Sequence, residues 1–238
     1  MELLTKEQLE ELRQFDGPTI CNALETFGDQ YRLEGYCKPG MQLRTAALQK
    51  PMIGYAATVK ASAMHPKAGS AEKLIAYYRT VRETPDPTIA VVQDIDPEPV
   101  GSFWGEVQAT THKSLGAVGT ITAGGVRDVR EVEELGFYFF STDLLISHGY
   151  THVEDFNCTV DIHGLAVNPG DLLFADCYGV VKIPHEIAPK LAEACRKAAA
   201  AELPMLEPCR KAIADGVKPT DEDLLAWRKA MEQKRKEV

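Results

Sequence analysis

Short runs of β-branched and aromatic residues alternate with charged, amphipathic stretches through the middle third of the chain. The apolar runs are TIAVVQDI at 88–95, AVGTIT at 117–122 and FYFF at 137–140, and helical character lies between them at 105–114 and 128–135. Strands that alternate with helices pack in layers, because each element must bury its apolar face against another. This alternation predicts an α/β layered fold, and it constrains the chain more than any other feature.

The pattern changes after residue 158, where short strands are separated by tight turns. Segments such as CTVDIHGLAV, NPGD and LLFADC are typical of hairpins. The chain lacks the Gly-x-Gly-x-x-Gly and Walker fingerprints, so a doubly wound nucleotide-binding fold is not expected. From Pro184 we expect a long helical tail, interrupted by Pro204, Pro208 and Gly216, and a last helix from about Thr220. Without repeats or low-complexity linkers, residues 1–238 are predicted to form a single domain.

Composition and charge exclude several classes of protein. Lys and Arg number 26 against 35 Asp and Glu, and the net charge of −9 argues against nucleic-acid binding through phosphate neutralisation. No stretch approaches the roughly 18 apolar residues of a membrane span, and the charged start MELLTKEQLE has no signal-peptide core. The six cysteines are far apart, so free thiols are expected and disulfides are not. The expected location is the cytoplasm, with no membrane or nucleic-acid partner.

The strongest candidate site combines two segments, WGEVQ from residue 104 and TAGGVRD from residue 122. Gly105 precedes a predicted helix, whose first N–H groups lack intrahelical acceptors and can bind a carboxylate. If the two flanking strands are neighbours, both loops open at one edge of the sheet. Glu106, Arg127 and Asp128 then meet, offering two acids for a hard cation and a guanidinium for an oxyanion.

The same residues have a simpler explanation. Arg127 and Asp128 are then a solvated helix start, and Glu106 is a partner of its helix dipole. Short charged motifs recur by chance, so spacing alone favours this explanation.

A family resemblance changes that balance. The motif Glu106-x20-Arg127-Asp128 with Gly105 before it resembles the signature of the RraA-like family. That family includes class II 4-hydroxy-4-methyl-2-oxoglutarate aldolases and the protein regulator of RNase E activity. The resemblance covers about residues 15–186 and is supported by FDGPTICNALE, VVQDIDPEPVGSFWGE and PGDLLFADCYGVVKIP. Residues from about 187 to 238 then form a helical C-terminal extension.

The resemblance implies a fold, a ligand set and an assembly. The expected fold is a three-layer β/β/α arrangement similar to swivelling domains. Arg127 is expected to contact the oxygens of the substrate, and Asp128 to anchor Mg²⁺ or Mn²⁺ largely through waters. Active sites between subunits imply a homotrimer or a hexamer. The loop expected to hold the pyruvate part of the substrate comprises Gly105, Glu106, Val107 and Gln108.

The sequence departs from the family pattern in three places. Ala123 stands where members often have Asp, and the acid at Glu106 is Asp in others. Leu206 lies near the place of a Glu that characterised aldolases take from a neighbouring subunit. Glu202 and Glu207 are the nearest candidates for that role.

Other candidates are weaker. His148 and His152 have the spacing of paired zinc ligands on a helix, but they lie in a loop-like stretch. Lys60 and Lys182 could form a Schiff base, although Lys in an edge strand is more often solvated. Asp176 is interpreted as a turn acid.

Two functional hypotheses follow from the residues and the resemblance. The first is a metal-dependent pyruvate aldolase that cleaves 4-hydroxy-2-oxo acids and also decarboxylates oxaloacetate. In it Arg127 stabilises the enolate and Glu106 orients a water bound to the metal as the base. The second is a non-catalytic regulator that binds a protein partner such as a ribonuclease.

Overall fold

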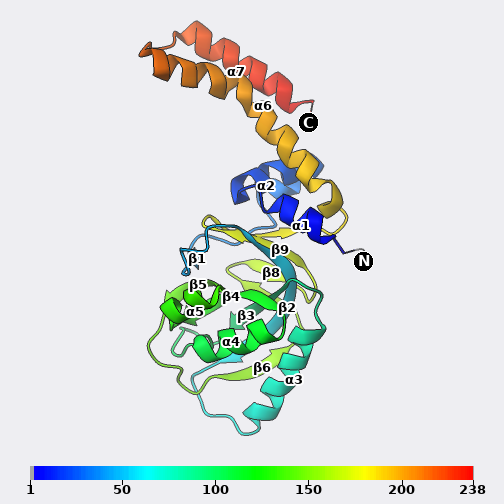
Figure 1. The fold of residues 1–238 in the computed structure, drawn as a ribbon, viewed down its shortest axis with the longest axis vertical. Helices are drawn as coiled ribbons and strands as arrows, with labels where there is room; N and C mark the ends of the chain where they lie inside the picture. Colours follow the sequence, from blue (N-terminus) through cyan, green and yellow to red (C-terminus); the bar gives the residue numbers. More distant parts are fainter. Residues whose placement is uncertain (1–2, 238) are drawn as a thin grey trace.

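A central sheet of eight strands organises the structure, a computed structural model that describes residues 3–237 (Figure 1). Strands β2, β3, β4 and β5 run parallel to one another in chain order, and a helix follows β2, β3 and β4. Because parallel strands end at the same edge, the loops after β3, β4 and β5 lie close together. The bounds of these strands are Met52–Ser62, Thr88–Asp94, Ala117–Val126 and Tyr138–Leu144.

Antiparallel strands complete the sheet and add a second one. Strand β1 pairs with β5, β6 pairs with β2, and β9 with β10 forms a hairpin that continues from β2. Strands β7 and β8 form a separate hairpin, whose turn at His163 and Gly164 has positive φ at both residues, as a two-residue turn requires. The bounds are β1 Gln42–Leu43, β6 His152–Phe156, β7 Val160–Ile162, β8 Leu165–Val167, β9 Leu172–Asp176 and β10 Gly179–Ile183.

Each face of the central sheet is covered by a different layer. Helices α3 (Ser70–Glu83), α4 (Glu106–Ser114) and α5 (Val129–Leu135) pack on one face, where Ala90 and Val92 of β3 point. Ile89 and Val91 point to the opposite face, which the β7–β8 hairpin covers. Alternate residues of β3 therefore pack into two different cores, one on each face of the sheet. The predicted β/β/α layering is confirmed.

A third core joins the N-terminal helices to the start of the C-terminal extension. Helix α1 (Lys6–Leu12) begins at a capping box between Thr5 and Gln8, and Asp16 caps α2 (Gly17–Leu24). Their buried side chains pack with α6 against β2, β9 and β10. Two short 3₁₀ turns follow at Glu25–Phe27 and Asp29–Arg32.

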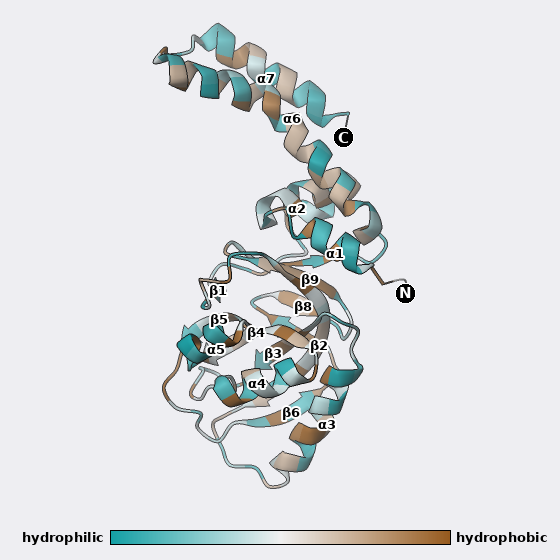
Figure 2. Cartoon of the chain, viewed as in Figure 1, coloured by the Kyte–Doolittle hydropathy of each residue, from teal (hydrophilic) through white to brown (hydrophobic). Residues whose placement is uncertain are grey.

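The C-terminal extension corrects one expectation. Helix α6 (Ala188–Asp215) continues through Pro204 and Pro208, which were expected to interrupt it. Each proline removes a single N–H donor, and at these partly exposed positions water can satisfy the freed carbonyls, so the helix bends instead of ending (Figure 1). Helix α7 (Asp221–Arg235) returns antiparallel, and hydrophilic residues make up most of it (Figure 2).

Helices α6 and α7 form an arm that projects from the rest of the molecule, the body, which contains the sheet and the helices that cover it (Figure 1). The buried residues of α6 lie between Ala188 and Ala201, so only the first half of the helix joins the core. No helix within residues 3–237 combines the length and the apolar character needed to cross a bilayer. All six cysteines are free, and of these only Cys195 is fully buried.

Candidate active site

The segment before α4 is joined directly to the end of β4. Trp104 forms a single parallel bridge with Val126, and the Arg127 N–H donates to the Trp104 carbonyl oxygen at 3.0 Å. Gly105 and Asp128 therefore lie side by side, although 22 residues of sequence separate Glu106 from Asp128. The prediction that both loops open at one edge of the sheet is confirmed.

Gly105 is required here by close approach, since its backbone is extended with φ of −155°. A Cβ at this position would lie 2.5 Å from Asp128 Oδ2, so any other residue would displace the Asp128 carboxylate. The Glu106 N–H donates to the same carboxylate oxygen at 3.0 Å. The N-terminus of α4 thus binds a carboxylate of the chain itself. This is favourable because the first N–H groups of a helix have no intrahelical acceptors and carry a partial positive charge.

Two further donors of α4 remain at this end. Within residues 3–237, the N–H groups of Val107 and Gln108 find no backbone acceptor, whereas the Ala109 N–H bonds to Gly105. They can bind one carboxylate of a ligand without any basic side chain.

Asp128 has a backbone conformation that is uncommon for residues other than glycine. Its φ of 56° and ψ of 39° lie in the left-handed region, which Asp tolerates better than most residues. It stands at the start of α5 but its side chain does not cap that helix. The carboxylate turns back to Glu106, and Oδ1 is left without a partner in the described chain.

Arg127 is held at the edge of the site. Its Nε lies 3.7 Å from Asp128 Oδ2, and its Nη1 donates to the Ile146 carbonyl oxygen at 3.4 Å. The side chain is 36% exposed, and Nη2 makes no hydrogen bond within residues 3–237. One edge of the guanidinium is therefore available to a ligand.

The loop after β5 closes the site from a third side. Leu145 N–H bonds to Val126, and Ser102 N–H bonds to Ser147 at 2.8 Å. The cavity is partly open to solvent and has a volume of about 170 Å³, below the range usual for drug-sized ligands, so it suits a small acid. Its walls consist of Ser102, Phe103, Gly105, Val107, Gln108, Arg127, Asp128, His148 and Thr151.

The structure brings most of the predicted site residues together. Gly105, Val107, Gln108, Arg127 and Asp128 all line this cavity. Glu106 takes part through its backbone N–H alone. Its side chain is exposed and has no hydrogen-bond or ion-pair partner in the described chain.

The weaker candidates lie elsewhere. His152 is buried and bonds Glu154 at 2.8 Å, so it does not pair with His148. Lys182 forms an ion pair with Asp171 at 3.4 Å. Asp176 accepts the N–H groups of Gly17 and Tyr178, as expected of a turn acid.

Two residues of the site were not assigned to it by sequence reasoning, which considered His148 only as a zinc ligand. His148 and Thr151 lie on the loop after β5, and their position at the same edge as Arg127 was the available signal. The Nδ1 of His148 lies 2.7 Å from the Gly149 carbonyl oxygen, which favours the tautomer with its proton on Nδ1 and a free Nε2. Asp94 ends β3 beside Gly124, outside the walls of this cavity, and burial raises its pKa to about 6.

A buried aromatic cluster packs against the inner face of α4. His112 of α4 packs on Trp104 with ring centroids 4.5 Å apart, and its ring nitrogens face Gln108 and Tyr77. Burial lowers the pKa of His112 to about 4, so the imidazole is neutral at pH 7.

The donor set restricts which metal fits. Within residues 3–237, no group of three or more His, Cys, Asp or Glu side chains is arranged to hold an ion. Asp128 alone brings a carboxylate to the cavity wall, with one oxygen free. Mg²⁺ keeps most of its water and binds through one or two carboxylates, so this set fits a hydrated hard cation.

Comparison with known proteins agrees with this geometry. The family model RraA-like (Aldolase/RraA) matches residues 17–182. The chain belongs to the RraA-like family. A similar solved structure is RraAS2 from Streptomyces coelicolor, described as an unusual member of the RNase ES inhibitor RraA protein family. The match covers 82% of this chain and 92% of the RraAS2 chain, with a TM-score of 0.63 and 21% identity. At that identity the likeness shows the fold.

Curated relatives match in part. Protein DlpA of Legionella pneumophila is 33% identical over 117 residues, which are 48% of this chain and 18% of DlpA. A protein of Halalkalibacterium halodurans named "Putative 4-hydroxy-4-methyl-2-oxoglutarate aldolase" is 29% identical over 106 residues, 44% of this chain and 49% of that protein. The chain thus matches less than half the length of these relatives.

Proposed function

We propose that this protein is a class II aldolase that cleaves 4-hydroxy-2-oxo acids to pyruvate. The observation that carries the proposal is the meeting of Arg127, Asp128 and the N-terminus of α4 around one small cavity. The name of the Halalkalibacterium relative supports the same class of reaction. A pure binding protein has no evident need for this arrangement.

The cavity residues suit the two ends of such a substrate. The N–H groups of Val107 and Gln108 bind the substrate carboxylate. The free edge of Arg127 donates to the 2-oxo oxygen, where negative charge grows as the C3–C4 bond breaks to leave the pyruvate enolate. Asp128 would hold Mg²⁺ or Mn²⁺ through its free oxygen, and the ion would supply Lewis-acid polarisation of the 2-oxo group.

Oxaloacetate decarboxylation follows from the same binding mode. Loss of CO₂ from oxaloacetate leaves the same pyruvate enolate, whose charge Arg127 stabilises in the same way. We therefore propose it as a second activity of this site.

Removal of the C4 hydroxyl proton has two candidate bases. A metal-bound water oriented by Glu106 was predicted from the sequence, and the Glu106 side chain is exposed and outside the cavity walls. His148 lines the cavity, and its free Nε2 can accept a proton. Glu106→Gln and His148→Gln, compared in the same assay, decide between them by which variant loses turnover.

A homotrimer or hexamer is proposed for the assembly. Glu202 is already bound within its own chain, to Arg235 at 3.1 Å and to Asn22 at 3.4 Å. Glu207 is exposed and makes no contact with another charged group in the described chain. We therefore propose Glu207 as the residue that the arm supplies to a neighbouring subunit.

One assay separates this proposal from the alternative of a non-catalytic regulator that binds a ribonuclease. Pyruvate release is measured on a panel of 4-hydroxy-2-oxo acids and oxaloacetate, with EDTA and then with excess Mg²⁺ or Mn²⁺. We expect activity to disappear with EDTA and to return with either metal. Pyruvate release that persists in EDTA, a lysine trapped by borohydride, or no release on any substrate would refute the class II assignment.

A further inference from the structure

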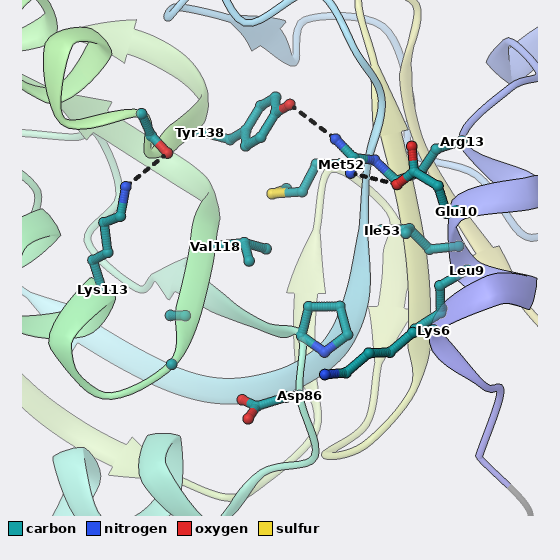
Figure 3. A pocket seen from close by; sticks show the side chains of 14 residues that line it. Lys6, Leu9, Glu10, Arg13, Met52, Ile53, Asp86, Lys113, Val118 and Tyr138 are labelled. Carbon is teal, nitrogen blue, oxygen red and sulfur yellow. Dashed lines mark hydrogen bonds and ion pairs between the residues drawn. The ribbon is translucent and has the colours of Figure 1, made fainter.

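A second cavity, larger than that of the candidate active site, lies at the other end of strand β4. It has a volume of about 500 Å³ and opens between α1 and the amino-terminal ends of the parallel strands (Figure 3). Strand β4 begins at this cavity with Ala117 and ends beside the active site with Val126. Ten residues of strand span roughly 30 Å, so the two cavities are separate sites.

The floor of this cavity is apolar. Its size falls in the range of small-molecule sites, which are mostly apolar with a few polar groups at defined places. The apolar lining consists of Leu9, Met52, Ile53, Pro87, Ala117 and Val118.

Positive charge prevails at the rim, although the whole chain is acidic. The rim carries the cations Lys6, Arg13 and Lys113 and the carboxylates of Glu10 and Asp86 (Figure 3). Glu10 already pairs with Arg13 at 2.9 Å. It also pairs with Lys50, at 3.5 Å, which adds a fourth cation beside the rim.

Two of the cations have no carboxylate partner. The ammonium of Lys113 donates to the carbonyl oxygens of Leu135 and Gly136 at the end of α5, and it has no carboxylate partner in the described chain. Lys6 makes no hydrogen bond or ion pair within residues 3–237. Cations without a carboxylate partner above an apolar floor are complementary to a ligand that has an anionic head and an apolar body.

We propose that this cavity binds a small amphipathic organic anion, such as a medium-chain alkyl or aryl carboxylate. The apolar body lies on Met52 and Val118, and the head faces Lys6 and Lys113. The proposal does not depend on the aldolase activity, since none of these residues lines the active-site cavity.

The test uses the full-length protein and the fluorescent anion 8-anilinonaphthalene-1-sulfonate as the probe. We expect saturable binding of one probe per chain and displacement by octanoate. The uncharged 1-octanol should displace it at least tenfold less effectively, because it lacks the head group that the lysines attract. Absence of saturable binding, as when a neighbouring subunit covers the cavity, overturns the proposal, and so does equal displacement by the alcohol.

Two variants locate the probe. Val118→Trp fills the cavity and should abolish binding. Lys6→Glu should weaken binding about five- to tenfold, as reversal of a nearby surface charge implies. Lys6 is exposed in the first turn of α1, where an acid suits the helix, so this variant remains informative even if Val118→Trp fails to fold.

Lys229→Glu is the matched control, because it makes the same change of net charge on an exposed position of α7. It should bind the probe as the unaltered protein does. If Lys6→Glu and Lys229→Glu bind the probe equally, the proposal is wrong.

Discussion

At the scale of single residues, the neighbours Arg127 and Asp128 face the same cavity with different tasks. Arg127 offers donors to a substrate oxygen, and Asp128 offers one free carboxylate oxygen to a cation. The left-handed backbone of Asp128 gives the two residues these different positions, since it directs the Asp128 side chain back to the start of α4.

Arg127→Ala is expected to lower turnover by about 10²–10³, the range for loss of one oxyanion donor. The loss should fall on kcat, because the charge that Arg127 binds develops in the transition state. Arg127→Lys should recover little, since an ammonium cannot reproduce the planar fork. Steady-state kinetics of pyruvate release measure both. Unchanged kcat in Arg127→Ala would remove Arg127 from the mechanism.

Asp128→Asn is expected to weaken metal affinity while leaving the fold intact. Asn tolerates the left-handed region as Asp does, and its amide oxygen still accepts the Glu106 N–H. Excess Mg²⁺ should restore part of the activity of Asp128→Asn and none of that of Arg127→Ala. Turnover measured against Mg²⁺ concentration tests this, and an identical metal response of the two variants contradicts the assigned roles.

At the scale of elements, α4 depends on a buried histidine. Its N-terminus forms one wall of the active site, and His112 anchors the same helix among Trp104 and Tyr77. Burial holds the pKa of His112 at about 4, well below that of an unfolded chain. Between pH 6.5 and pH 4 the unfolded state therefore binds a proton that the folded state does not.

The consequence is that His112 contributes stability above pH 6.5, and that this contribution is lost as pH falls toward 4. The loss is about 2–3 kcal/mol. In His112→Phe, Tyr77 loses a partner, so the variant should be less stable at pH 7.5 by about 1–2 kcal/mol. The difference should shrink by pH 5.

Urea unfolding at both pH values measures this prediction. The exposed His65→Phe is the control, and it should leave the pH dependence unchanged. A constant difference between His112→Phe and the unaltered protein at the two pH values would show that His112 does not titrate as inferred.

At the scale of the whole molecule, the body and the arm differ in how they are stabilised. Three cores hold the body together, whereas the outer half of α6 packs mainly on α7. Ile213, Val217 and Leu225 are exposed on this arm. Such an arm is suited to contact a neighbouring subunit in a closed assembly.

Light scattering is expected to report about three or six times the chain mass of 26.2 kDa. Within that assembly, Glu207→Gln should lower turnover without changing the mass, and Glu193→Gln, exposed on the inner half of α6, should not. A stable monomer that turns over 2-oxo acids would contradict the shared site.

The sequence by itself determined the alternation of strands and helices, the start of the last helix at Thr220, and the edge that joins Gly105 to Arg127. These follow from local rules of periodicity and capping and from the rule that parallel strands end together. They were therefore predictable without the tertiary structure.

Only the tertiary structure decided which groups face the cavity. It placed His148 and Thr151 in the wall, left the Glu106 side chain exposed outside it, and continued α6 through Pro204 and Pro208. It also opened the second cavity beside α1. Each of these depends on contacts between segments distant in sequence, or on how far water reaches the backbone, and no local pattern encodes either.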